Sequence, residues 1–332
     1  MRGSVTPVLI NIADRLTGTL GRVTRSVSST YRRTSSTASD GAQVLKKANA
    51  SGAQHLLEET RTVRQPHPLR AQRPTHNTNY RPSNTESAMA ARRLKTDVGF
   101  TGDMRAAVGR SSTKVFKMRS TDGELNIYKP IYGEDNEVGL PFLRLPGSLT
   151  SREIAAYRVD EILGFGRIPP TARTDGVIGP NGRPAGPGMI QQFVDSTPSR
   201  PVTDYPEIQQ QQVAVLDYII GSMDRHPGNY RTVDRGDHLD VVAIDHGRSF
   251  PIAHKPLEIE IDSDFVTAHK GRQLDPEVLD ALHNADTDRL RAALEDAGNI
   301  HPNSIDGALA RLEKVRELGR IPADVKVKFY PP

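Results

Sequence analysis

The stretch DRHPGN, residues 224–229, is followed by LDVVAIDHG, residues 239–247. In the first stretch Asp224 stands five positions before Asn229, and in the second an apolar strand ends at Asp245. A short hairpin separates the two stretches, so we expect the chain to fold back and bring these three side chains together. Carboxylate and amide oxygens are the ligands that Mg²⁺ prefers, and a carboxylate can also orient a hydroxyl and accept its proton. Alone, each residue is a common turn cap or strand end, but their order and spacing together predict a phosphoryl-transfer centre.

The same residues carry a resemblance to a known family. DRHxxN followed by a strand and Asp-x-Gly resembles the catalytic loop and metal-binding motif of the phosphatidylinositol 3-/4-kinase-like superfamily. LDYIIGSMDRHPGNY, residues 216–230, and VVAIDHGRSFP, residues 241–251, look especially like the type II phosphatidylinositol 4-kinase branch and its bacterial relatives. The resemblance covers roughly residues 105–260 and is absent from residues 1–95.

The resemblance implies ATP and Mg²⁺ as cofactors and assigns roles to individual residues. Asp224 is then the catalytic carboxylate, and Asn229 and Asp245 are the Mg²⁺ ligands. Two interpretations of His226 stay open. It either assists the hydroxyl and the transferring charge, or it is a loop histidine that bonds the backbone.

A nucleotide-binding lysine is predicted in Tyr128-Lys129-Pro130, which resembles the corresponding motif of the family. A kinase needs one lysine aimed at the nucleotide phosphates from its β-rich lobe. Glu153 resembles the helix glutamate that pairs with this lysine. The alternative is that Glu153 forms a capping box with Thr150 at the start of a helix. One carboxylate cannot easily serve both roles, and we favour the ion pair.

Two further segments are candidates for nucleotide contacts. Gly109, Ser111 and Ser112 precede the first strand of a hairpin, where small residues let backbone N–H groups approach a phosphate. A plain Ser-rich turn would have the same sequence. The stretch that holds Gln192 and Val194 resembles the hinge between the lobes, where backbone groups would bind adenine. An ordinary strand end is the alternative.

The pattern of elements predicts an α+β chain with a two-lobed protein-kinase-like fold. A β-rich N-lobe is expected over about 97–194 and a helical C-lobe over about 195–332. Expected strands are 114–119, 124–130, segments within 167–194, and two that flank a turn before Asp245. Expected helices are 150–163, 206–222, 275–284, 286–297 and 304–318.

The N-terminal segment, residues 1–96, differs in composition from the rest. Of the 332 residues only 5% are aromatic, and residues 22–41 and 61–87 are rich in Ser, Thr, Arg and Pro. Residues 1–95 carry 16 basic and 5 acidic residues, a balance of +11, against −7 for the remainder. Such composition buries too little apolar area to offset chain entropy, so we expect a mostly disordered basic segment before a catalytic domain over 97–332. Helices are expected near 7–20 and 41–59.

No stretch approaches the ~20 apolar residues of a membrane span, which predicts a soluble, cytoplasmic protein. The Ser/Arg-rich start is also compatible with a bacterial effector delivered into another cell. There is no cysteine, which excludes disulfides and thiolate metal sites. No nucleic-acid-binding module is recognisable, so no nucleic-acid partner is expected.

The acceptor is predicted to be a protein hydroxyl, including the chain's own Ser and Thr residues. After Asp245 the chain becomes acidic, with Glu258, Glu260, Asp262 and Asp264, which would repel a phosphoinositide headgroup. A lipid kinase, with membrane lipid reached through the basic segment, is one alternative. A nucleotidyl transferase on the same fold and a non-catalytic pseudokinase scaffold are the others.

Overall fold

The computed structural model describes residues 80–81, 83–102, 113–134, 145–175 and 186–328. The chain divides into two units, Met1–Arg73 and Pro74–Pro332, and every described element belongs to the second. The helices predicted near 7–20 and 41–59 lie outside the described residues, so they stay predictions.

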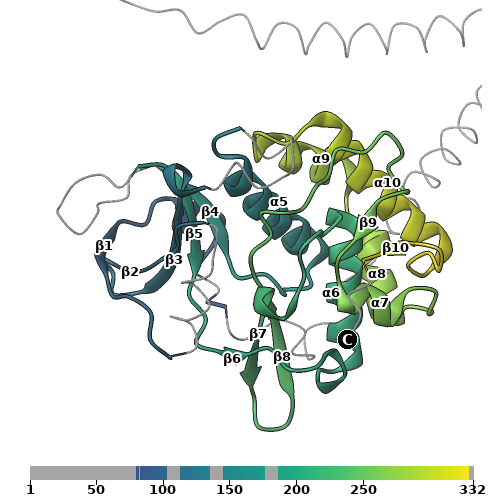
Figure 1. Cartoon of the computed structure of the whole chain (residues 1–332), viewed down its shortest axis with the longest axis horizontal. Helices are drawn as coiled ribbons and strands as arrows, with labels where there is room; N and C mark the ends of the chain where they lie inside the picture. Colours follow the sequence, from purple (N-terminus) through teal and green to yellow (C-terminus); the bar gives the residue numbers. More distant parts are fainter. Residues whose placement is uncertain (1–79, 82, 103–112, 135–144, 176–185, 329–332) are drawn as a thin grey trace, which may run out of the picture. The chain divides into compact units, whose positions relative to one another are not determined.

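The first half of this unit is a five-stranded antiparallel sheet with the strand order β1-β2-β3-β5-β4 (Figure 1). The strands are β1 (Leu94–Asp97), β2 (Phe116–Ser120), β3 (Leu125–Pro130), β4 (Thr171–Thr174) and β5 (Gly188–Gln192). A hairpin joins β2 to β3, which correspond to the strands expected at 114–119 and 124–130, and Gly123 in its turn takes a φ of +88° that favours glycine. A small core that includes Met118, Tyr128 and Ile190 lies under the sheet.

Regular structure begins earlier than the predicted domain start at residue 97. Helix α3 (Glu86–Ala90) is capped by Thr85, and β1 pairs with β2 as the edge strand. Neither element was predicted from the sequence, because α3 buries only Met89 and β1 buries only Leu94. One buried residue per element produces neither a helical nor a strand period.

Helix α5 (Ser148–Leu163) contacts strands β4 and β5 as well as helices of the second half, and it ends before Gly164, as predicted. Its start differs from the prediction, because Thr150 lies inside the helix and Gly147 is the N-cap residue. Helix starts leave backbone N–H groups without partners. Here Glu134 supplies the acceptors, taking hydrogen bonds from the N–H groups of Gly147 and Thr150 at 2.8 Å each. The capping box between Thr150 and Glu153 is therefore wrong.

The second half is mainly helical and contains a three-stranded antiparallel sheet, β6-β7-β8. Its helices are α6 (Glu207–Ile220), α7 (Asp264–His269), α8 (Pro276–Asn284), α9 (Thr287–Asp296) and α10 (Pro302–Leu318), and its strands are β6 (Thr197–Pro198), β7 (Tyr230–Asp234), β8 (Leu239–Ala243) and the parallel pair β9 (Glu260–Ile261) with β10 (Lys326–Val327). The predicted α+β class, with a β-rich half before a helical half, is confirmed; α7 was not predicted. Among the helices of the described ranges, none is long and apolar enough to cross a membrane.

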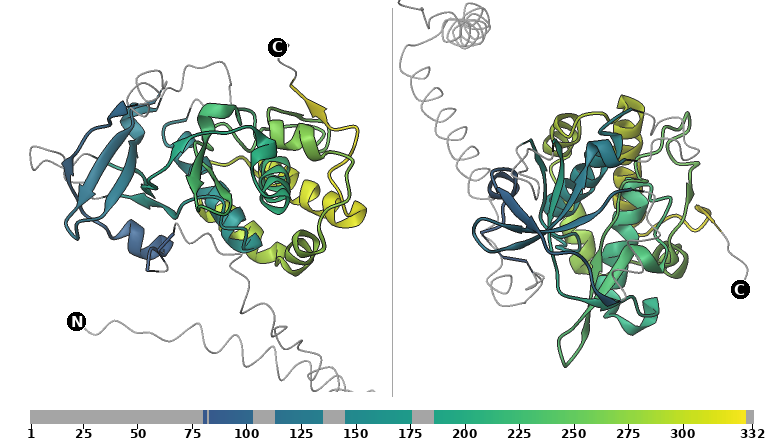
Figure 2. Two further views of the ribbon diagram at one scale, coloured as in Figure 1. Left: turned by 90° about the horizontal axis from the view of Figure 1, so that it is seen from below. Right: turned by 60° about the vertical axis from the view of Figure 1, so that its left-hand side comes forward.

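The larger hydrophobic core lies in the helical half. It unites Val213 and Leu216 of α6, Leu290 of α9 and Leu312 of α10, together with Val159 of α5. Figure 2 shows these helices from two further directions, with the sheet to one side of them.

Candidate active site

The β7–β8 hairpin brings the two polar stretches of the sequence together. Tyr230 pairs with Ala243, and the N–H of Ile244 donates to the carbonyl oxygen of Asn229 at 3.0 Å. Asn229 and Asp245 consequently lie at the same end of neighbouring strands. Asp245 adopts a left-handed conformation with a φ of +57°, a strained region that is found disproportionately at functional sites.

Arg225 holds the loop before β7 in place. Its guanidinium donates to the carbonyl oxygens of Asn229, at 2.5 Å, and Ile244, at 2.6 Å. Nε and Nη2 of the same guanidinium donate to the carboxylate of Asp217 on α6 at 3.1–3.2 Å. Both side chains are buried, with 1% and 0% of their surface exposed. Arg225 therefore has a structural role, because it bonds the carbonyl groups of this loop.

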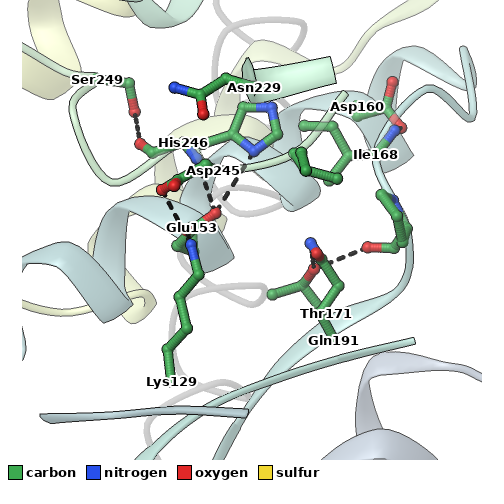
Figure 3. A network of polar contacts seen from close by, with 12 residues as sticks. Lys129, Glu153, Asp160, Ile168, Thr171, Gln191, Asn229, Asp245, His246 and Ser249 are labelled. Atoms are coloured by element: carbon green, nitrogen blue, oxygen red, sulfur yellow. Dashed lines mark hydrogen bonds and ion pairs between the residues drawn. The ribbon is translucent and has the colours of Figure 1, made fainter. Parts of the chain in front are cut away.

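Lys129 of β3 forms ion pairs with residues of two other segments (Figure 3). Its Nζ lies 2.6 Å from Oε1 of Glu153 on α5 and 2.9 Å from Oδ1 of Asp245. The second oxygen of Glu153 accepts from the backbone N–H of His246 at 2.8 Å. Sheet, helix and the end of β8 thus converge here. The structure brings together Lys129 and Glu153 as the favoured interpretation of the sequence requires.

The charges of this group stabilise one another. Burial disfavours the charged form of Lys129, but the carboxylates of Asp245 and Glu153 outweigh it and raise the pKa of Lys129. Burial also acts against ionised Glu153, yet Lys129 and the contact from His246 hold the pKa of Glu153 well below its usual range. Lys129 is therefore a cation and Glu153 an anion at neutral pH.

Asp224 lies beside this group with 29% of its side chain exposed. Burial raises the pKa of its carboxyl, and Arg248 and His226 oppose the rise. Nη1 of Arg248 is 3.8 Å from Oδ2 of Asp224. The amide nitrogen of Asn229 donates to the backbone oxygen of Asp224 at 2.6 Å, which orients that amide. A carboxylate with a raised pKa and access to solvent is suited to accept a proton.

These groups surround a cavity of about 620 Å³ between the sheet and the helical half. Lys129, Asp224 and Asp245 line it. Apolar side chains, among them Ile127 and Val242, line it as well. A cavity of this volume, with both apolar side chains and convergent polar groups in its lining, is typical of a small-molecule site.

Comparison with known proteins relates part of the chain to a family. Residues 179–281 match the family described as phosphatidylinositol 3- and 4-kinase. This match and the curated relatives support assignment of the region to the phosphatidylinositol 3-/4-kinase-like superfamily. Phosphatidylinositol 4-kinase gamma 4 from Oryza sativa subsp. japonica is 31% identical over 41% of this chain and 29% of its own length. The protein of the same name from Arabidopsis thaliana is 28% identical over 47% of this chain and 33% of its length. The chain thus spans a third or less of each relative's length.

Solved structures of kinases also align with this chain. A Golgi casein kinase with Mn/ADP bound is 16% identical, with 74% of this chain and 77% of that chain covered and a TM-score of 0.45. The Helicobacter pylori proinflammatory kinase CtkA is 12% identical, with 70% and 94% covered and a TM-score of 0.42.

The predicted hinge includes Gln192, the last residue of β5, and continues beyond the strand. Gln192 and Val194 both line the cavity. The side-chain oxygen of Gln192, however, accepts from Asn84 at 2.8 Å and its N–H donates to Pro170, so its polar groups serve the fold. The carbonyl of Val194 accepts from Ser196 at 3.1 Å. Adenine binding at this hinge stays a prediction, as does phosphate binding by Gly109, Ser111 and Ser112, which lie outside the described residues.

His226 shows the backbone contact that the second interpretation requires. Its Nδ1 accepts from the N–H of Gly228 at 2.9 Å and so caps the short turn Pro227–Asn229. His226 nevertheless lines the cavity and is exposed. A catalytic part for His226 stays a prediction.

Other residues of the site were missed by sequence reasoning. Ile127 lies on the same face of β3 as Lys129, which a period of two could have indicated. Arg248 lines the cavity and faces Asp224. Glu134 has no local sequence signal, because it acts on a helix that begins 14 residues later.

Proposed function

We propose that this protein is an ATP- and Mg²⁺-dependent phosphotransferase. The observation that carries the proposal is the contact of Lys129 with both Glu153 and Asp245 at the edge of the 620 Å³ cavity. A lysine paired with a helix glutamate and placed next to a metal-binding aspartate is the arrangement that kinases use to hold ATP phosphates. The family match supports the same reaction.

The donor set fits a magnesium ion. Asp245 presents a carboxylate with 41% of its side chain exposed, and Asn229 has its amide oriented through the bond to Asp224. Hard oxygen donors of this kind suit Mg²⁺, which would neutralise phosphate charge during transfer. Lys129 would bind phosphate oxygens and Asp224 would orient the acceptor hydroxyl and take its proton. The apolar part of the cavity would hold the adenine.

A protein hydroxyl is the acceptor that we propose. Glu258, Glu260 and Asp264 are exposed. Their segment passes the catalytic loop, because the N–H of Arg225 donates to the carbonyl of Asp262 at 2.8 Å. An acidic segment at this place disfavours a polyanionic headgroup and suits a basic peptide.

A lipid acceptor is the second candidate, and the relatives favour it. Both curated relatives are named phosphatidylinositol 4-kinase gamma 4. The N-terminal segment, with its balance of +11 over residues 1–95, supplies the charge that could bring the enzyme to an anionic membrane.

Transfer of radioactive label tests the reaction and the acceptor together. We expect label from γ-labelled ATP, but not from α-labelled ATP, to reach the protein itself or a protein in a cell extract. EDTA should abolish the transfer. Label in the lipid fraction would select the lipid acceptor, and transfer of the α-label would mean nucleotidyl transfer. Absence of both transfers, with no Mg²⁺-dependent ATP binding, would reject the enzyme and favour a scaffold.

The pH dependence of transfer gives a second test, through Arg248. Since Arg248 opposes the rise in the pKa of Asp224, Arg248→Gln should raise that pKa further. Asp224 must be ionised to accept a proton, so the acid limb of the kcat/KM profile should move to higher pH. Lys255→Gln, which removes a cation from an exposed pair with Glu258, is the control and should leave the limb in place. A limb that moves to lower pH in Arg248→Gln would contradict the role of Asp224.

A further inference from the structure

Helix α5, which carries Glu153, packs as part of the helical half. Its buried side chains Ile154, Val159 and Leu163 belong to the same hydrophobic cluster as residues of α6, α9 and α10. Within the described ranges, the separate core under the sheet is built from residues of α3 and β1–β5. The apolar side chains of the helix that carries Glu153 therefore pack with the helical half, although α5 also contacts β4 and β5, whereas Lys129 comes from the sheet.

Arg158, in the second half of α5, bonds the last turn of α9. Its Nη1 donates to the carbonyl oxygen of Ala293 at 2.6 Å, and its Nη2 lies 2.8 Å from the carboxylate of Asp296. The same guanidinium bonds Glu86 of α3 at 2.7–3.2 Å. A cation at the end of a helix interacts favourably with the carbonyl groups there.

Arg173 makes the corresponding contact from the sheet. It lies on β4, and its Nη2 donates at 2.9 Å both to the carbonyl oxygen of Ala297, the residue that ends α9, and to Oγ of Ser151 on α5. One end of α9 thus receives an arginine from α5 and an arginine from the sheet. Figure 1 shows α9 next to α5.

Arg152 fixes α5 on its other side. This buried side chain donates to the carbonyl oxygen of Ser249, at 2.9 Å, in the segment that follows Asp245. It also bonds the carbonyl of Ser148 at 3.0 Å. Because Arg152 is adjacent to Glu153 and contacts the segment after a proposed metal ligand, it is less suited to a test than Arg158 and Arg173.

We propose that Arg158 and Arg173 are positioning residues, which hold α5 against the end of α9 so that Glu153 is already paired with Lys129 before nucleotide binds. The expected effect on kinetics rests on the proposed function. The fastening of α5, that is, the effect of the two arginines on how firmly α5 is held against α9, can be measured whether or not the protein is a kinase. It distinguishes this domain from one in which the glutamate helix must first move inward to complete the site.

A matched control exists in the same domain. Arg316 of α10 donates to the carbonyl oxygens of Leu282, at 2.7 Å, and Ala285, at 2.5 Å, at the end of α8. Its side chain is 14% exposed, as is that of Arg158. Arg316 therefore caps a helix end with the same chemistry, but away from Glu153. A purely structural role would make Arg316→Gln and the Arg158→Gln/Arg173→Gln variant behave alike.

Hydrogen–deuterium exchange on the full-length protein tests the fastening directly. In Arg158→Gln/Arg173→Gln we expect exchange of the amides of α5, residues 148–163, to be about tenfold faster than in wild type. In Arg316→Gln the amides of α5 should exchange as in wild type. Arg173→Gln alone provides the same comparison in a less perturbed background if the double variant does not fold. Unchanged α5 exchange in Arg173→Gln and the double variant would overturn the proposal.

A mutant cycle with Glu153→Gln tests whether the arginines act through Glu153. We expect Glu153→Gln to lower kcat/KM by about 10²-fold, and the combined variant with both arginine substitutions to be no worse. If the factors by which the separate variants lower kcat/KM multiply in the combined variant, the arginines act independently of Glu153. Dissociation constants for MgATP, measured by equilibrium dialysis, provide the same cycle without catalysis. If wild type transfers no label, the proposed function fails, while the exchange and binding measurements still decide the fastening.

Discussion

Replacing Asp224 by Asn should lower kcat by about 10²–10⁴-fold, while affinity for MgATP stays close to that of wild type. Asn keeps the size of the side chain but cannot accept a proton from the acceptor hydroxyl. The backbone oxygen of Asp224, which orients Asn229, is unaffected by the substitution. Steady-state kinetics together with equilibrium dialysis would separate the two effects.

Asp245→Asn is the control variant, because it distinguishes the loss of a metal ligand from the loss of the base. Asp245 contacts Lys129 at 2.9 Å and is a proposed metal ligand, so its loss should weaken MgATP binding as well as transfer. The two aspartates would then differ in which constant they change. If Asp224→Asn instead lost affinity to the same degree as Asp245→Asn, Asp224 would be a metal ligand and not the base.

The sequence predicted those parts of the site whose geometry follows from neighbouring residues in the chain. Asp224, Asn229 and Asp245 are placed by a hairpin of fixed register, so their spacing alone indicated that they converge. Lys129 and Glu153 lie in different elements of the chain, so local spacing does not predict that they pair. That prediction came from the resemblance to a family. Once the structure is known, the same pair also decides between the two interpretations of Glu153.

Contacts with polar groups of a segment far away in the sequence could not be predicted. The start of α5 is capped by Glu134, so the local signal at Thr150 pointed to the wrong residue. The early elements α3 and β1 are held by side chains such as Asn84, which bonds Gln192 at 2.8 Å. A stretch that is polar and rich in Arg by composition can still be ordered when it has such partners, because its polar groups are then satisfied.

Replacing Arg225 by Met should lower the free energy of unfolding by about 3–5 kcal/mol. The substitution leaves the fully buried carboxylate of Asp217 without its cation, and the carbonyl of Asn229 loses a donor. Denaturant unfolding would measure the loss. Arg291→Met is the control, since Arg291 pairs with Asp306 at 2.7 Å and both side chains are exposed, at 43% and 54%. Its removal should cost only about 0–1 kcal/mol.

The double variant Arg225→Met/Asp217→Leu separates stability from function. Without a charge left unpaired in the interior, it should regain much of the stability lost in Arg225→Met. Phosphoryl transfer should stay impaired, because the carbonyls of Asn229 and Ile244 still lack the guanidinium that holds the loop at the proposed metal site. A double variant as active as wild type would mean that the hairpin alone positions Asn229 and Asp245. One that remains as unstable as Arg225→Met would show that the carbonyl contacts, and not the ion pair, carry the stability.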